Sequence, residues 1–229
     1  MYYLFVNFKT YKEGTGSNAI ALAKLLSSFH TGEVDIIPVA QASDIKEIST
    51  NVSLKVFAQH IDPITFGSNT GYILPEAVKQ AGAIGTILNH AENKRDNKFI
   101  QKAVKQCKEA GLKVMLCAES MKRAQQLAKF SPEFIAIEPP ELIGGDISVS
   151  TAKPTLISAS VKAIQKINPK IIVITGAGIK NGGDVSKAIE LGTKGVFVAS
   201  GIVVAKDQEH AIRQLLSGFP SRSSDKVEP

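Results

Sequence analysis

The sequence predicts a single-domain α/β fold of the (β/α)8 type, in which parallel strands close into a barrel and a helix follows each strand. The first observation is strict alternation, because short β-branched runs alternate with amphipathic segments along all 229 residues. The second is their number, since each kind of segment occurs eight times, as a closed barrel with right-handed crossovers requires. The third is that no composition shift or Gly/Ser-rich linker divides the chain. An open, doubly wound sheet is the alternative architecture.

The expected strands are short runs enriched in Val, Ile, Leu and Phe, residues that suit a pleated and buried surface. In chain order they are Tyr3–Phe8, Val34–Val39, Leu54–Ala58, Ile84–Asn89, Leu112–Cys117, Phe134–Ile137, Ile171–Thr175 and Gly195–Ala199. The expected helices lie between them, where apolar residues recur every three or four positions. These are Ser17–Phe29, Asp44–Thr50, Pro75–Ala81, Lys94–Ala110, Ser120–Lys129, Thr151–Ile167, Asp184–Leu191 and Asp207–Leu216.

Two segments fall outside this pattern. Residues 59–74, with the sequence QHIDPITFGSNTGYIL, form a long loop after the third strand, and compact domains rarely contain such a loop without a functional role. Residues 217–229 are polar and lack apolar periodicity. We therefore expect a barrel domain over residues 1–218 and a disordered tail over residues 219–229.

The charge distribution argues against a nucleic-acid partner. The 27 basic and 21 acidic residues give a formal charge of +6 at pH 7. Arginine, the residue that most often reads bases, occurs only four times, and the lysines are scattered over helical faces with few aromatic residues between them. A basic surface field would instead favour association with a phosphorylated metabolite.

The cysteine content favours a reducing compartment. The chain has two cysteines, Cys107 and Cys117, which are too few for a secreted disulfide framework. There is no basic-then-apolar leader at the start, and no uncharged run approaches the roughly 20 residues of a transmembrane helix. We expect a soluble cytoplasmic protein with no membrane partner.

If the barrel forms, function is expected at the carboxyl ends of its strands. Polar residues follow three of these ends: Asn7 and Lys9 the first strand, residues 89–92 (Asn-His-Ala-Glu) the fourth, and Glu138 the sixth. Taken singly, each fits an ordinary structural role, such as a surface lysine or a hydrogen-bonded histidine. Their convergence on one rim predicts an active site.

The segment after the sixth strand, residues 135–150 with the sequence IAIEPPELIGGDISVS, has the composition of a lid. Pro139 and Pro140 stiffen the start of the loop, whereas Gly144 and Gly145 permit backbone angles that other residues avoid. This combination predicts that residues 141–143 move as a body over the site. An ordinary strand-to-helix loop with a solvated glutamate is the alternative.

Glycine turns follow the last two strands, at residues 176–178 (Gly-Ala-Gly) and 199–201 (Ala-Ser-Gly). Backbone N–H groups in such turns approach an anion closely, which predicts a phosphate site. The run GAGIKNGG does not fit the dinucleotide fingerprint, because Asn181 occupies the third glycine position, so we expect no nicotinamide cofactor. We also expect no metal, since the four histidines are isolated and no CxxC or HExxH spacing occurs.

With these motifs in view, the chain resembles the triosephosphate isomerases, specifically the short archaeal type, from about Tyr3 to Gly218. The motifs VNFKTY, FAQHID, LNHAE, EPPELIG, GAGI and GVFVASG occur in the family's order. The resemblance implies a TIM barrel that interconverts dihydroxyacetone phosphate and D-glyceraldehyde 3-phosphate, in glycolysis and gluconeogenesis, without a cofactor. It assigns catalysis to Lys9, His90 and Glu138, and substrate binding to Asn7, Lys9, Ile143, Gly144, Gly145, Gly178, Ala199 and Ser200.

The resemblance also implies a role for each catalytic residue. Glu138 would move a proton between adjacent carbons through an enediol intermediate, and closure of the lid would exclude water. His90, held neutral by the start of the helix after it, would move a proton between the two oxygens while Lys9 stabilises negative charge. In the family the long loop reaches a neighbouring subunit, which implies a homodimer or a tetramer of dimers with Gln59 to Tyr72 at the interface.

Two positions depart from the family pattern. Ala91 stands where a serine usually contacts the base, which leaves the resting position of Glu138 open. Gly145-Asp146 replaces the commoner Thr-Gly at the far end of the lid, and we expect altered lid dynamics.

Two other classes of protein remain as alternatives. A sugar-phosphate aldolase would need a Schiff-base lysine inside the barrel, and the sixth strand offers none. A non-catalytic phosphate-binding relative would keep the glycine turns but not the charged trio.

Overall fold

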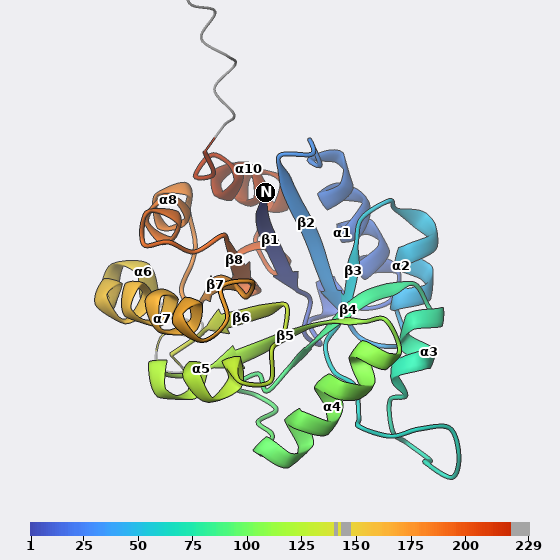
Figure 1. Cartoon of the computed structure of the whole chain (residues 1–229). Coiled ribbons are helices and arrows are strands. Elements are labelled where there is room, and N and C mark those ends of the chain that lie inside the picture. The colour runs from blue at the N-terminus through green and yellow to red at the C-terminus, as the bar shows by residue number, and fades with distance from the viewer. Residues whose placement is uncertain (140–141, 143–147, 221–229) are drawn as a thin grey trace, which may run out of the picture.

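The structure, a computed structural model, describes residues 1–139, 142 and 148–220. Within these residues the strands pair in chain order, each parallel to its neighbours, and β8 pairs with β1 to close a barrel (Figure 1). The predicted (β/α)8 fold is confirmed. The strands are β1 Tyr2–Asn7, β2 Val34–Ala40, β3 Val56–Ala58, β4 Ala83–Leu88, β5 Lys113–Ala118, β6 Phe134–Ile137, β7 Ile172–Gly176 and β8 Gly195–Val198.

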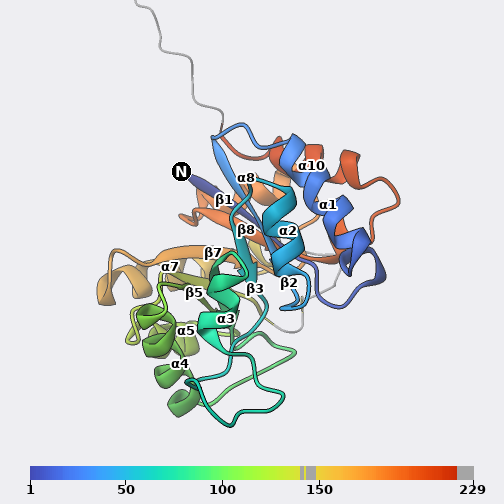
Figure 2. The same ribbon diagram turned by 90° about the vertical axis from the view of Figure 1, so that its right-hand side faces the viewer.

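The helices form an outer layer around the barrel (Figures 1 and 2). Eight of them correspond to the predicted segments: α1 Ser17–Ser28, α2 Ile45–Asn51, α3 Pro75–Gln80, α4 Asn97–Glu109, α5 Met121–Ala128, α7 Pro154–Ile167, α8 Gly182–Glu190 and α10 Gln208–Leu216. Among the described residues, the short turns η1 Lys12–Gly14 and α9 Ser200–Val203 were not predicted, and α6 Val149–Ala152 overlaps the start of the helix predicted over residues 151–167. No helix in the described part of the chain is long and apolar enough to cross a bilayer.

Two of the predicted helix boundaries were wrong. The helix expected from Lys94 begins at Asn97, because Asp96 caps it and accepts a hydrogen bond from the Phe99 N–H at 2.8 Å. The helix expected over residues 151–167 is broken before Pro154, whose ring disfavours helical geometry at the preceding residue. Lys153 accordingly has φ −136° and ψ 55°.

The interior of the barrel is a packed apolar core. Its buried residues, contributed by all eight strands, are Phe5, Ile37, Val39, Phe57, Ile87, Met115, Cys117, Phe134, Ala136, Ile174 and Phe197. The ring centre of Phe5 lies 5.3 Å from those of Phe57 and Phe134. A Cβ atom on Gly85 would overlap the Phe57 ring, so glycine at this position makes room for the aromatic core. The barrel is therefore filled below its carboxyl end.

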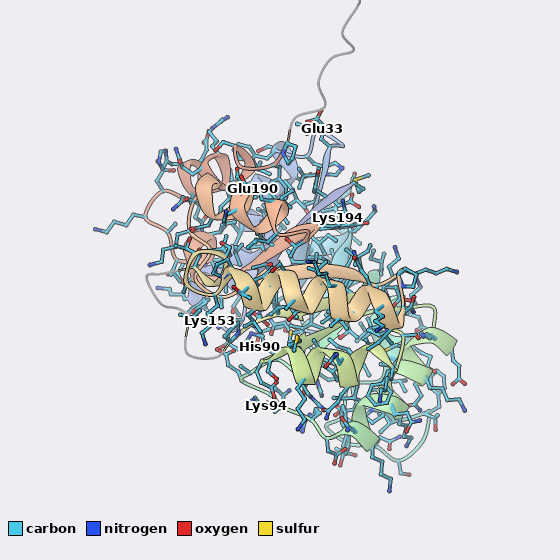
Figure 3. All side chains as sticks on the ribbon, turned by 60° about the vertical axis from the view of Figure 1, so that its left-hand side comes forward. Glu33, His90, Lys94, Lys153, Glu190 and Lys194 are labelled. Atoms are coloured by element: carbon cyan, nitrogen blue, oxygen red, sulfur yellow. The ribbon has the colours of Figure 1, made fainter. Side chains whose placement is uncertain are left out.

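A second apolar layer separates the strands from the surrounding helices. Lys94, Glu190 and Lys194 are exposed and project from the outer surface (Figure 3). Phe219, which was expected to belong to the tail, is 8% exposed and packs against Tyr2 with ring centres 5.9 Å apart. The packed chain thus continues one residue beyond the expected boundary, whereas residues 221–229 of the predicted tail lie outside the described residues.

Candidate active site

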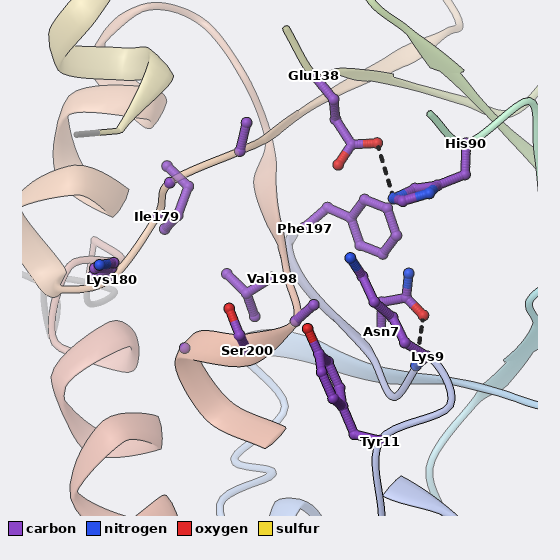
Figure 4. Close-up of a pocket in the computed structure, with 14 residues that line it drawn as sticks. Asn7, Lys9, Tyr11, His90, Glu138, Ile179, Lys180, Phe197, Val198 and Ser200 are labelled. Atoms are coloured by element: carbon purple, nitrogen blue, oxygen red, sulfur yellow. Dashed lines mark hydrogen bonds and ion pairs between the residues drawn. The ribbon is translucent and has the colours of Figure 1, made fainter. Parts of the chain in front are cut away.

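A cleft with about 560 Å³ of empty space opens at the carboxyl ends of the strands. It brings together most of the residues that the sequence singled out, on β1, β4, β6, β7 and β8 or directly after them (Figure 4). The predicted site residues that line the cleft are Asn7, Lys9, His90, Glu138, Gly178, Ala199 and Ser200. Ile143, Gly144 and Gly145 lie outside the described residues, as do Pro140, Glu141 and Asp146 of the predicted lid.

Lys9 is held in an unfavourable backbone conformation by its neighbours. Its φ of 46° lies in the left-handed region, which non-glycine residues rarely adopt. The buried Asn7 side chain accepts a hydrogen bond from the Lys9 N–H at 3.0 Å, and Gln59 Nε2 donates to the Lys9 carbonyl oxygen at 2.8 Å. Lys9 Nζ lies 2.7 Å from Glu92 Oε1. The lysine is therefore restrained at both its backbone and its ammonium group.

His90 follows β4 on a turn that Asn89 stabilises. Asn89 has φ 61°, and its side chain donates to the Cys117 carbonyl oxygen at 2.8 Å and accepts from the Arg95 N–H at 2.9 Å. The imidazole is buried, and its Nδ1 accepts a hydrogen bond from the Glu92 N–H at 3.2 Å. A ring nitrogen that accepts does not carry the proton, so the proton lies on Nε2.

The turn after His90 orients its ring. α4 begins only at Asn97, and between the two residues the backbone N–H of Glu92 donates to His90 Nδ1. His90 Nε2 then faces Glu138, whose Oε2 lies 4.0 Å away.

Glu138 directly follows β6 and is 5% exposed. Its backbone N–H donates to the Ala118 carbonyl oxygen at 2.9 Å, which fixes the start of its side chain. Burial raises the pKa of the Glu138 carboxyl above its ordinary value of 4.5, while His90, the Cys117 thiol and Lys9 act to lower it. Oε2 has no hydrogen-bond partner among the described residues. The carboxylate is therefore a desolvated group that faces the cleft.

Space for this carboxylate comes from Gly176 at the end of β7. A Cβ atom at position 176 would lie 2.5 Å from Glu138 Oε1 and 2.6 Å from its Cγ, far inside van der Waals contact. From the sequence, Gly176 was interpreted as part of a glycine turn that binds phosphate, and not as a neighbour of Glu138. Its neighbours Ala177 and Gly178 form that turn, with φ values of 73° and 72°.

Two residues contribute to the site in ways that the sequence did not specify: Glu92 was noted only among the polar residues that end the fourth strand, and Cys117 only as one of two cysteines. The Glu92 side chain is 59% exposed, yet it pairs with Lys9 and places its other oxygen 3.6 Å from His90 Nδ1. Cys117 lies inside the barrel, where its thiol adjoins the Glu138 carboxylate and burial raises its own pKa. The two-residue spacing between His90 and Glu92 could have predicted that Glu92 contributes to the site, because one turn can orient both side chains.

A smaller hollow of about 160 Å³ lies on the other side of Glu138. Asn89, Ala91, Lys94 and Glu119 contribute to its wall. Ala91, the position that departs from the family pattern, lines this hollow together with Glu138, and its methyl group offers the carboxylate no hydroxyl group.

Both glycine turns contribute to the wall of the cleft. Gly178, Ser200 and Gly201 line it, and their backbone N–H groups donate to no atom of the described residues. Unpaired N–H groups that converge on a cleft suit a phosphate group. Within the described ranges, no three His, Cys, Asp or Glu side chains are grouped as metal ligands.

Comparisons with known proteins agree with this arrangement. A family model described as triosephosphate isomerase matches residues 2–215. The triosephosphate isomerase of Methanothermus fervidus is 45% identical over 215 residues, which are 93% of this chain and 97% of that protein. The triosephosphate isomerase of Methanobacterium bryantii is 44% identical over 216 residues, with 93% and 95% covered. That of Methanocaldococcus jannaschii is 42% identical over 214 residues, with 93% and 98% covered.

Proposed function

The chain belongs to the triosephosphate isomerase family, and from this premise we propose that Lys9, His90 and Glu138 catalyse its reaction. The protein is an isomerase that interconverts dihydroxyacetone phosphate and D-glyceraldehyde 3-phosphate, a step of glycolysis. The observation that carries the assignment of residues is the position of the Glu138 carboxylate, buried, 4.0 Å from His90 Nε2 and in the same cleft as Lys9.

Glu138 is the base in this proposal. Its carboxylate removes a proton from the carbon next to the substrate carbonyl and returns it to the neighbouring carbon, so that one group serves both steps. Because burial raises the pKa of Glu138, the carboxylate is a stronger base than a solvated glutamate. No further base is needed, since the enediol intermediate takes the same proton back at its second carbon.

His90 and Lys9 act on the oxygens. The Nε2 proton of His90 is donated to the developing oxyanion and exchanged between the two oxygens, as the tautomer set by the Glu92 N–H allows. The Lys9 ammonium adds positive charge without transferring a proton. This charge is held at the cleft because Asn7 and Gln59 restrain the lysine backbone and Glu92 restrains its ammonium group.

The phosphate group is proposed to lie on the backbone N–H groups of the two glycine turns, with Gly178, Ala199 and Ser200 around it. Ile143, Gly144 and Gly145 are proposed to close over it from the lid segment. Closure would exclude water from the intermediate and keep its phosphate from leaving in a side reaction.

A coupled assay tests the reaction directly. Purified protein should convert D-glyceraldehyde 3-phosphate to dihydroxyacetone phosphate, and Glu138→Ala prepared in parallel serves as the negative control. Absence of turnover in a folded wild-type protein would refute the proposal and revive a non-catalytic phosphate-binding relative, which the family membership does not favour.

The raised pKa of Glu138 predicts the pH dependence of the reaction. Because the base must be deprotonated, kcat/KM should fall as the pH decreases through the raised pKa, so the acid limb should lie above 4.5. D-Glyceraldehyde is the suitable substrate, since it has no phosphate that titrates in this range. Glu119→Gln, at the far wall of the smaller hollow, should leave the limb in place. An acid limb at or below 4.5 would contradict the prediction.

We further propose that residues 59–72 form a subunit interface in a homodimer or a tetramer of dimers. Hydrogen bonds restrain the loop, because the Asp62 side chain accepts from the Ile73 N–H at 2.8 Å and Gln106 donates to the Ile64 carbonyl oxygen at 3.0 Å. Two large side chains of the loop lie on the surface, Phe66, which is 73% exposed, and Tyr72, which is 60% exposed. Large apolar side chains on a restrained loop favour a protein partner.

Sedimentation of Phe66→Glu tests the interface. The wild type is expected to sediment as a dimer or larger, and the variant as a monomer with a lower kcat, because Gln59 links the start of this loop to the Lys9 carbonyl oxygen. Ile167→Glu, a matched change at an exposed residue of α7, should leave the assembly intact. A fully active wild-type monomer would contradict the interface.

The cytoplasm is the proposed location. Support comes from Cys107 and Cys117, which are both buried and both free. Free buried thiols are typical of proteins kept under reducing conditions.

A further inference from the structure

Tyr11 lies in the cleft and has no assigned role. Its partly buried ring packs against the outer apolar layer, and the residue lines the cleft together with Gly178, Ser200 and Gly201. In Figure 4 its hydroxyl group points toward the start of α9, where Ser200 lies. No hydrogen bond from this hydroxyl group to a described residue occurs.

Hydrogen bonds restrain the backbone of the turn that carries Tyr11. The Tyr11 carbonyl oxygen accepts hydrogen bonds from the Gly14 N–H at 2.9 Å and from Thr15 Oγ1 at 2.8 Å. Gly14 in turn packs against Phe8 so closely that a Cβ atom there would lie 2.6 Å from the Phe8 carbonyl oxygen. Tyr11 therefore presents its hydroxyl group from a rigid turn, at little cost in conformational entropy on binding.

A phosphate group bound beside these glycine turns would accept hydrogen bonds from more than one side. Gly178, Ser200 and Gly201 line the cleft from the side of β7 and β8, whereas Tyr11 lines it from the segment after β1, so an anion between them would be approached from two sides. A phosphate dianion has more acceptor sites than three N–H groups occupy, and an O–H donor to a charged oxygen forms a short, strong hydrogen bond.

We propose that the Tyr11 hydroxyl group donates a hydrogen bond to the phosphate of the bound triose phosphate and thereby contributes to selection of phosphorylated over unphosphorylated substrates. This inference rests on the proposed function, because the phosphate belongs to that substrate. Tyr11 takes no part in the proton transfers, so its contribution belongs to binding.

Tyr11→Phe tests the inference, because it removes the hydroxyl group and keeps the ring. The KM for D-glyceraldehyde 3-phosphate should rise about ten-fold, as for the loss of one hydrogen bond to a charged group, while kcat changes less than about two-fold. The inhibition constant of inorganic phosphate should rise by the same factor, whereas kcat/KM for D-glyceraldehyde should not change. Tyr2→Phe, at the opposite end of β1, is the matched control and should alter none of these values.

Two outcomes would overturn the inference. One is an unchanged KM and an unchanged inhibition constant for phosphate. The other is a lower kcat with an unchanged inhibition constant, which would mean that Tyr11 acts through Lys9 and not on phosphate. If the wild type shows no turnover, the proposed function fails, and the increase in Tm with inorganic phosphate still tests Tyr11. That increase should be smaller in Tyr11→Phe than in the wild type.

Discussion

Glu138→Gln should lower kcat by about 10³- to 10⁴-fold, the contribution typical of a positioned general base. Glutamine keeps the size of the side chain, and its place beside Gly176 and His90, but it cannot accept the substrate proton. The KM should change little, because Glu138 is not among the residues proposed to hold the substrate phosphate. Steady-state kinetics measure both values. A kcat within about ten-fold of the wild type would exclude Glu138 as the base.

The same variant should be more stable than the wild type at a pH above the raised pKa of Glu138. A glutamate whose folded-state pKa is raised contributes stability at low pH and loses it as the pH rises through that pKa. Above this pKa the Glu138 carboxylate is ionised at a cost to folding, and the neutral amide of glutamine removes that cost. Thermal unfolding should show a higher Tm, by roughly 2–4 °C for each kcal/mol relieved in a chain of this length.

The stability difference should also depend on pH. It should shrink as the pH falls below the raised pKa, where the wild-type carboxyl group becomes neutral. Glu119→Gln, which is not enclosed in the core, is the matched control and should show no such pH-dependent gain. A Tm for Glu138→Gln below that of the wild type throughout the pH range would contradict the assignment of a destabilising charge.

Gly176→Ala should lower kcat by about 100-fold, as expected when a catalytic group is displaced by about 1 Å. The new Cβ atom would lie 2.5 Å from Glu138 Oε1 and 2.8 Å from Cδ, so the carboxylate must move away from its present position. The change inserts a methyl group into a filled space, and it should also destabilise the fold by about 1–3 kcal/mol. Steady-state kinetics and chemical denaturation measure the two effects separately.

Gly183→Ala is the control for this variant. Gly183 lies in the first turn of α8, where a Cβ atom would come no closer than 3.1 Å to Asn181 Oδ1, and alanine favours a helix over glycine. Its kcat should stay near the wild-type value. If Gly176→Ala were equally active, the space beside Glu138 would not be needed for the reaction.

Much of the fold follows from local patterns in the sequence. Apolar runs predicted every strand, and no boundary differed by more than two residues, because buried parallel strands are apolar on both faces. Helix ends were less predictable, since periodicity identifies the middle of a helix and caps decide its ends. Asp96 and Pro154 both carried the needed signal, in an N-cap side chain and in a ring that excludes helical geometry before it.

The residues of the site also differ in how far the sequence alone predicts their positions. Lys9, His90 and Glu138 were predictable because the topology brings the carboxyl ends of parallel strands to one rim. The pairing of Lys9 with Glu92 joins residues 83 positions apart, and it depends on the twist and closure of the barrel. The fit of Gly176 beside Glu138 depends on the register between β6 and β7, which pairs Ile137 with Thr175. Such contacts do not follow from spacing along the chain.

The aromatic packing below the cleft has a kinetic consequence. Since Phe5, Phe57, Phe134 and Phe197 fill the barrel, the cleft is a blind end within the part of the chain that the structure describes. Ligands enter and leave through the same opening, and the cleft has no space behind a bound ligand for a second molecule. The aldose and the ketose therefore cannot be bound at the same time. Each should act as a purely competitive inhibitor of the other's conversion, which suits a reaction with one substrate, one product and no co-reactant.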